Sequence, residues 1–169
     1  MTKQKMKTLL LAAGFAVLLC GCTKSNIVHS ESEAADPDFN FYNDIELDME
    51  QLHEDVDDIA LVQEDYPMGA AVDFDLHLDE EYVDVIAVVK DETTPEDAAL
   101  FADAAIKILN DQVAVQDFTY GESDEGTFGG LYQDNEIHLK VYEESEYESG
   151  KPLYETTIPK DTYVKIEIK

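Results

Sequence analysis

The chain has 169 residues, enough for one domain with short extensions. It carries 39 Asp and Glu against 11 Lys and no Arg, a formal charge of −28 at pH 7. From Cys22 onward the balance is 39 acids against 8 lysines, a formal charge of −31. Such a chain lacks the clustered basic side chains that bind phosphates, so we exclude nucleic acid as a direct partner. Its hydrophobic fraction of 44% is that of an ordinary globular domain and argues against wholesale disorder.

The first 21 residues have the three-part pattern of a secretory signal peptide. Residues 1–7 contain three lysines and no acid, and residues 8–19 form a continuous apolar run. The run is followed by Cys20, the small residue Gly21 and then Cys22. A basic start, a short apolar run and a small-residue cleavage site are typical of such peptides. The run is too short for a membrane-spanning helix, which needs ~20 residues.

The stretch Leu19-Cys20-Gly21-Cys22 resembles the lipobox of bacterial lipoprotein precursors. The resemblance covers residues 1–22 and implies cleavage after Gly21 and a diacylglycerol group on Cys22, with N-acylation, such as by palmitate, as a further step. Cys20 fits the pattern poorly because Leu19 would then occupy the small-residue position. The implied location is the extracytoplasmic face of a bacterial membrane. The alternative is an ordinary secreted protein with two incidental cysteines.

Three segments follow from this interpretation. Residues 1–21 are the expected signal peptide, and residues 22–40 are the lipidated cysteine and a flexible acidic tether rich in Ser, Ala, Asp and Glu. Residues 41–169 are expected to form one acidic domain. After cleavage Cys22 is the only cysteine, so the domain has no disulfide and depends on packing for its stability.

Two helices are expected in the domain. Apolar residues recur at spacings of three and four over residues 45–59, which predicts an amphipathic helix. Thr94 followed by Pro95 and two acids is a strong helix start, and an apolar face with helical spacing then continues to about residue 112.

The remaining apolar segments have the period of strands. Residues 70–79 alternate strictly and residues 82–89 are rich in β-branched side chains, which together predict an antiparallel hairpin. Further strands are expected at 113–120, 137–142, 153–158 and 164–168, with a glycine-rich loop at 121–130. Short connections favour an α+β fold: a mainly antiparallel sheet with helices packed on one face, in a two-layer sandwich.

No catalytic motif is present, and we expect the protein not to be an enzyme. Ser123 lies in a sequence that misses the nucleophile-elbow spacing by one residue and is interpreted as a turn residue. His53-Glu54 begins like a zinc-binding motif, but residue 57 is Asp, so we expect a solvated helix face.

One group of side chains has the composition of a metal site. Asp73, Asp75, His77 and Asp79 alternate along the strand at 70–79 and are expected on its exposed face. With a cross-strand residue such as Asp84 they could hold a divalent ion, although a solvated strand face explains the same pattern. We expect no cofactor apart from the lipid on Cys22, and Ca²⁺ is the ion to test.

The sequence therefore favours a lipid-anchored, non-enzymatic binding or accessory module of the bacterial envelope. Its expected partners are the membrane, through the lipid, and an envelope protein or a cationic ligand. The alternative function is a divalent-cation (Ca²⁺ or Mg²⁺) binding surface protein, and a third is a hydrolase whose site assembles only in the fold. High acidity can also reflect adaptation to a salty habitat.

Overall fold

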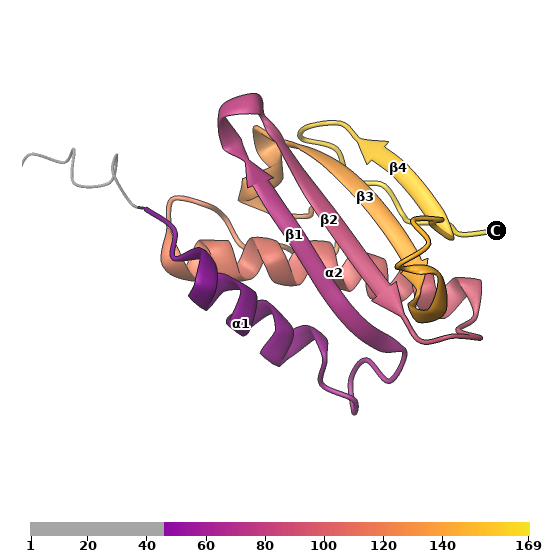
Figure 1. Ribbon diagram of the computed structural model, residues 1–169. Helices are drawn as coiled ribbons and strands as arrows, with labels where there is room; N and C mark the ends of the chain where they lie inside the picture. Colours follow the sequence, from indigo (N-terminus) through magenta and orange to yellow (C-terminus); the bar gives the residue numbers. More distant parts are fainter. Residues whose placement is uncertain (1–45) are drawn as a thin grey trace, which may run out of the picture. The chain divides into compact units, whose positions relative to one another are not determined.

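A computed structural model describes residues 46–169 (Figure 1). The expected signal peptide and tether, with Gly21 and Cys22, lie outside the described residues. Two α-helices, four strands and three 3₁₀ turns occur in this order: α1 (Met49–Ala60), β1 (Gly69–His77), η2 (Leu78–Glu80), β2 (Tyr82–Val89), α2 (Pro95–Gln116), η3 (Gly130–Gln133), β3 (Glu136–Glu143), η4 (Glu144–Glu146) and β4 (Tyr154–Ile158).

The four strands form one sheet in the order β1-β2-β3-β4. The outer pairs, β1/β2 and β3/β4, are antiparallel, while the central pair β2/β3 is parallel. Both helices contact the same sheet and each other, and in Figure 1 they lie together on one side of it. The predicted α+β class, with helices on one face, is confirmed. The parallel central pair was not predicted, and it requires the long connection that α2 provides.

Helix α2 begins where its sequence signal placed it, whereas α1 begins at Met49, later than the helix expected over residues 45–59. The Asp48 side chain accepts a hydrogen bond from the Gln51 N–H (3.1 Å) at the start of α1. At the start of α2 the Thr94 hydroxyl accepts one from the Asp97 N–H (3.2 Å), with Pro95 at the first helical position. These side chains satisfy N–H groups that have no partner inside the helix.

The strand expected at 113–120 is wrong, because α2 continues to Gln116. Ile106, Leu109 and Val113 are all fully buried, at spacings of three and four residues, so the helical period runs on past residue 112. The glycine-rich stretch 121–130 is a loop, as expected, that ends where η3 begins.

The core lies between the helices and the inner face of the sheet. The buried side chains of β1 and β2 alternate with outward ones, and Phe74 of β1 is 3% exposed, as the strand period predicted. The largest fully buried side chains come from both layers and the loops between them: Phe101, Phe128, Leu52, Ile106, Leu109, Leu131, Ile137, Leu139 and Ile158.

The segment after β4 is the second departure from the expected strands. Ile166 and Ile168 are buried in the core, but residues 162–169 belong to no strand in the described part of the chain. The predicted strand at 164–168 therefore has the side-chain pattern of a strand without the pairing.

Candidate functional site

The face of the sheet opposite the helices carries the candidate site, which we call the open face. Strand alternation and the register of the three strands place its side chains in neighbouring rows. The rows are His77, Tyr82 and Glu136; then Asp75, Asp84 and His138; then Asp73, Ile86 and Lys140. The open face thus brings together acids, imidazoles and an aromatic ring from β1, β2 and β3.

Three rings stack across this face. The Tyr82 ring lies between the imidazoles of His77 and His138, with centroid distances of 4.4 and 4.6 Å and interplanar angles of 22° and 19°. We call this arrangement the ring ladder. Stacked ring pairs of this kind contribute about 0.5–1.5 kcal/mol beyond the area that they bury. The ladder ties three strands together on a face that no helix covers.

A carboxylate joins the two ends of the ring ladder. The oxygens of Asp84 lie 3.5 Å from His77 Nε2 and 3.4 Å from His138 Nδ1, and Glu136 lies 3.8 Å from His138 Nε2. All four side chains remain between 35% and 45% exposed. Loss of hydration raises the pKa of the Tyr82 phenol, and nearby carboxylates, including that of Asp84, raise it further.

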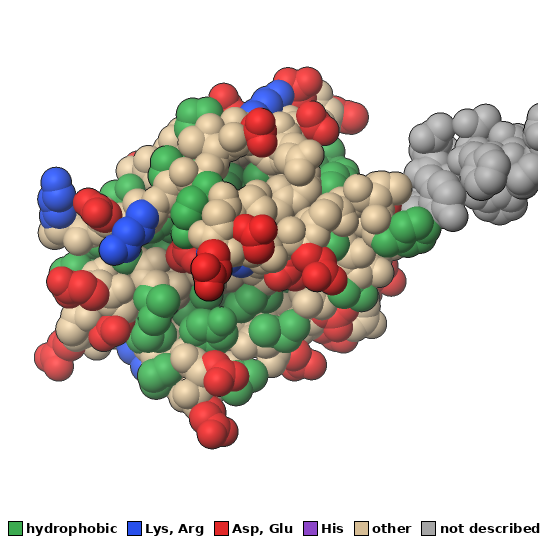
Figure 2. Space-filling view, turned by 180° about the vertical axis from the view of Figure 1, so that it is seen from behind, with side chains coloured by type: hydrophobic (Ala, Val, Ile, Leu, Met, Phe, Trp, Pro, Cys, Tyr) green, Lys and Arg blue, Asp and Glu red, His purple; other side chains and the backbone are tan. Residues whose placement is uncertain are grey.

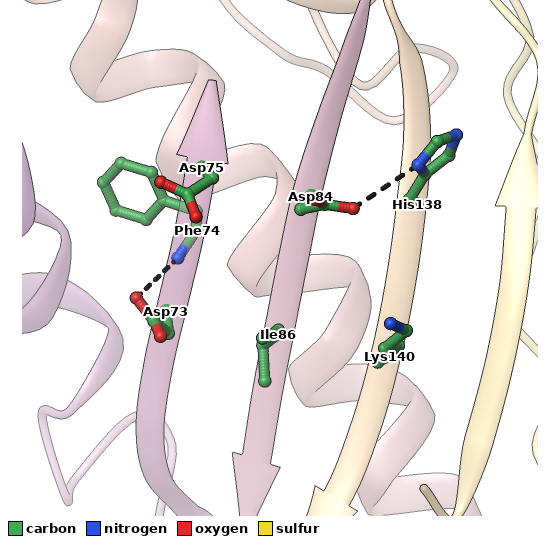
Figure 3. Close-up of a pocket in the computed structure, with 7 residues that line it drawn as sticks. All are labelled: Asp73, Phe74, Asp75, Asp84, Ile86, His138 and Lys140. Carbon is green, nitrogen blue, oxygen red and sulfur yellow. Dashed lines mark hydrogen bonds and ion pairs between the residues drawn. The ribbon is translucent and has the colours of Figure 1, made fainter. Parts of the chain in front are cut away.

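A small hollow lies beside the ladder. Figure 3 shows its lining, which combines carboxylates from β1 and β2, two apolar residues, and a histidine and a lysine from β3: Asp73, Phe74, Asp75, Asp84, Ile86, His138 and Lys140. The one cation in this lining, Lys140, lies 3.7 Å from Glu155 of β4. The carboxylates of β1 and β2 that line the hollow therefore have no ion pair to a lysine among the described residues.

The loop after β3 closes one end of the open face. Tyr147 packs edge-on against Tyr142, with ring centroids 5.4 Å apart, and Tyr142 is only 8% exposed. Burial raises the pKa of the Tyr147 phenol, and the charge and hydrogen bond of Asp73 raise it further. Asp73 also accepts a hydrogen bond from the Phe74 N–H (3.0 Å; Figure 3). Asp73 and Asp75 are both exposed, but Asp73 is engaged in these contacts.

The four predicted metal ligands are not brought together. Asp73, Asp75 and His77 share one face of β1, but the strand ends at His77 and Asp79 lies in the turn η2. The suggested cross-strand residue Asp84 does approach His77, as given above. Within residues 46–169 no group of three or more His, Cys, Asp or Glu side chains is arranged so that it could hold a metal ion.

Two other side chains singled out from the sequence have structural roles. The Ser123 hydroxyl donates a hydrogen bond to Asp111 of α2 (2.9 Å) and so ties the loop 121–130 to that helix. Ser123 lies in this loop, just before the turn at residues 125 and 126. The solvated position expected for His53 is wrong: its ring is partly buried and stacks on Phe74, with centroids 4.0 Å apart.

Sequence reasoning missed the ring ladder. Tyr82 and His138 each occupy an outward position of a predicted strand, and that was the available signal. The contact between the rings of Tyr82 and His138 depends on the parallel register of β2 and β3. In this register His138 lies opposite Asp84, which is the next outward residue after Tyr82 on β2. That register is not encoded in any local pattern.

The site defines an α+β domain with one sheet face left open and lined by acidic and aromatic side chains. Comparison with models of protein families, with curated proteins and with solved structures found no match. No helix within residues 46–169 is long and apolar enough to cross a membrane.

Proposed function

We propose that the protein is a lipid-anchored module on the extracytoplasmic face of a bacterial membrane, and that it works by binding rather than catalysis. The anchor is the diacylglycerol group on Cys22, after cleavage at Gly21. The binding surface is the open face of the sheet. The observation that carries this proposal is the ring ladder of His77, Tyr82 and His138 beside exposed carboxylates that have no ion pair to a lysine within residues 46–169.

The chemistry of the open face favours a partner with positive charge. Carboxylates pair with Lys and Arg side chains, and the stacked rings hold the carboxylate of Asp84 in place between His77 and His138. The whole molecule adds long-range attraction, because Figure 2 shows Asp and Glu spread over the opposite, helix-bearing side as well. An envelope protein with a basic segment, or a small cationic ligand, fits these features. Anionic lipid is repelled, which keeps the domain off the membrane surface.

The anchor is tested by substitution of the two cysteines in turn. Cys22→Ser should abolish incorporation of a fatty-acid probe and leave the chain unprocessed or mislocalised, because the lipid is attached to that thiol. Cys20→Ser is the matched control and should label normally. Labelling of the Cys22→Ser protein would show that the anchor assignment is wrong.

The binding surface is tested by charge reversal on each side of the molecule. Asp75→Lys changes the open face, and Glu54→Lys makes the same charge change on the exposed side of α1. After cross-linking in intact cells, the wild type and Glu54→Lys should retain the same partner, and Asp75→Lys should lose most of it. Tyr82→Ala should show the same loss, because it removes the centre of the ladder. Equal retention by all variants would exclude the open face as the binding surface.

A further inference from the structure

The segment 163–169 follows β4 and belongs to no strand of the described residues. Ile166 and Ile168 are 5% and 9% exposed, whereas Lys165 and Glu167 between and beside them are exposed. Burial that alternates with a period of two residues is typical of a strand. Among the described residues, however, no backbone hydrogen bond involves this segment, and the four-stranded sheet does not include it.

Its backbone is nevertheless held in place. The two isoleucines belong to the hydrophobic core, so the chain between them cannot move freely while the domain stays folded. A fixed row of unpaired N–H and C=O groups is a template for another strand. Because the segment is already ordered, the entropy cost of adding such a strand is reduced.

The charge near this segment selects a particular partner. Residues 151–169 contain four lysines and three acids, whereas residues 22–150 contain four lysines and the other 36 acids. In Figure 2 lysine side chains, with acidic ones among them, are visible on the side where, in Figure 1, the C-terminus lies. A second copy of this acidic chain therefore meets the least repulsion here.

The sequence of the segment is complementary to itself in one register. If two copies pair antiparallel about Ile166, Lys165 of each copy lies opposite Glu167 of the other, and Val164 lies opposite Ile168. The nearest shift in either direction that keeps the same side chains outward places Lys165 opposite Lys165, or Glu167 opposite Glu167. In-register parallel pairing also places like charges together. Opposite charges across a strand pair stabilise it and like charges destabilise it, so the register centred on Ile166, which pairs the whole of residues 163–169, is favoured.

We infer that two copies of the protein form a symmetric dimer through antiparallel pairing of residues 163–169. In such a dimer the same surface of each copy contacts the other. Tyr163 and Val164, which are 38% and 41% exposed in the single chain, lie in this interface. One short strand pair buries little area, so the dimer is weak in solution. This inference goes beyond the proposed function and does not use the open face.

Charge reversal tests the register directly. In the full chain purified in detergent, sedimentation over a concentration series should show a monomer–dimer equilibrium for the wild type. Lys165→Glu creates two pairs of facing carboxylates, and Glu167→Lys creates two pairs of facing ammonium groups. Each change should raise the dimer Kd about tenfold. The double variant Lys165→Glu/Glu167→Lys restores opposite charges and should bring the Kd back near the wild-type value.

Lys151→Glu and Glu125→Lys are the matched controls, because both residues are exposed and lie outside the segment. They should leave the Kd within about twofold, and unchanged far-ultraviolet circular dichroism should show that every variant is folded. A wild type that stays monomeric throughout the series would overturn the inference. So would a dimer that Lys165→Glu leaves intact, or one that the double variant fails to restore, since the copies would then meet through another surface.

Discussion

At the scale of single residues, the contact between His53 and Phe74 joins α1 to β1. The two rings stack almost in parallel, 16° apart, and Phe74 is nearly fully buried. Strand alternation alone predicted that Phe74 faces the core, because a period of two fixes which side chains share a face. The same alternation could not predict the stacked histidine, which lies on α1, the element before β1, and reaches Phe74 only when the helix packs on the sheet.

Phe74→Ala should lower the free energy of unfolding by about 3–5 kcal/mol, because it removes a buried ring and leaves a cavity. Urea unfolding of the variant and the wild type measures this difference. Val115→Ala is the control on α2, where the side chain is 72% exposed, and should change stability by less than about 0.5 kcal/mol. A cost below about 1 kcal/mol at Phe74 would contradict its role in the core.

Tyr132 should make stability depend on alkaline pH. Its ring is 4% exposed and its hydroxyl donates a hydrogen bond to the Ile106 carbonyl (3.1 Å). Burial raises the pKa of this phenol far above its ordinary value, and the charge of Asp111 adds to the effect. Because the pKa of the phenol is higher in the folded chain than in the unfolded chain, folding favours the protonated form. The contribution of Tyr132 to stability is therefore complete below about pH 10, the ordinary tyrosine value, and is lost as pH rises above it.

The measurement is the free energy of unfolding between neutral pH and pH 11, in the wild type and in Tyr132→Phe. The wild type should lose stability more steeply above about pH 10 than the variant, which has no proton to release there. At neutral pH the variant should lose only about 0.5–1.5 kcal/mol, the worth of one hydrogen bond. Identical slopes would show that Tyr132 does not control the alkaline transition.

At the scale of elements, α2 holds the long loop through one buried amide. Asn110 Oδ1 accepts a hydrogen bond from the Leu131 N–H (2.9 Å), and Nδ2 donates to the Gly121 carbonyl (3.0 Å). Gly129 has a φ of +107° and packs against this amide so closely that an added Cβ would lie 1.9 Å from Nδ2. The position requires glycine for both reasons.

Asn110→Ala should destabilise the protein by about 1–3 kcal/mol, because the Leu131 N–H is then buried without a partner. Gly129→Ala should also destabilise it strongly, through backbone strain and overlap with the amide. Gly121→Ala is the matched control, since its added methyl group meets no atom within 4 Å. Thermal unfolding ranks the three variants, and an equal effect of the two glycine variants would refute the close contact.

How far the sequence predicts these elements depends on how local their signals are. Thr94 and Pro95 mark the start of α2, and alternation marks β1, because these signals lie within the segment itself. The end of α2 was placed too early because the β-branched Val113 and Val115 also suit a strand. The pairing of β2 with β3, and hence the contact of Tyr82 with His138, depends on residues far apart in the chain. No local pattern specifies that register.

At the scale of the whole molecule, charge repulsion should make stability depend on salt. The chain from Cys22 onward has 39 acids and only 8 lysines, so most carboxylates have no cation to pair with. Added NaCl should raise the melting temperature by screening, as the Debye length falls from ~30 Å at 0.01 M to ~10 Å at 0.1 M. CaCl₂ at the same ionic strength should raise the melting temperature as NaCl does, with only a modest additional increase from the divalent ion.

The contrary result would be a saturable effect of Ca²⁺ on the melting temperature in a background of about 0.15 M NaCl. Selective binding stabilises the native state in proportion to ln(1 + [Ca²⁺]/Kd), and screening does not saturate in that way. Loss of such an effect in Asp75→Asn or His77→Ala would locate the ion on the open face and favour the cation-binding function.

The parallel pairing of β2 with β3 also has a kinetic consequence. The hairpin of β1 and β2 can form from neighbouring residues, and β3 with β4 likewise, but the central pair must wait until residues 90–135 have folded back across the sheet. Closing that long connection delays folding, because its entropy cost comes before the contacts that offset it. Until β3 arrives, β2 presents an apolar edge to every other chain nearby. We therefore expect the slow step of refolding to be the joining of the two halves, and aggregation to compete with it most strongly at that moment.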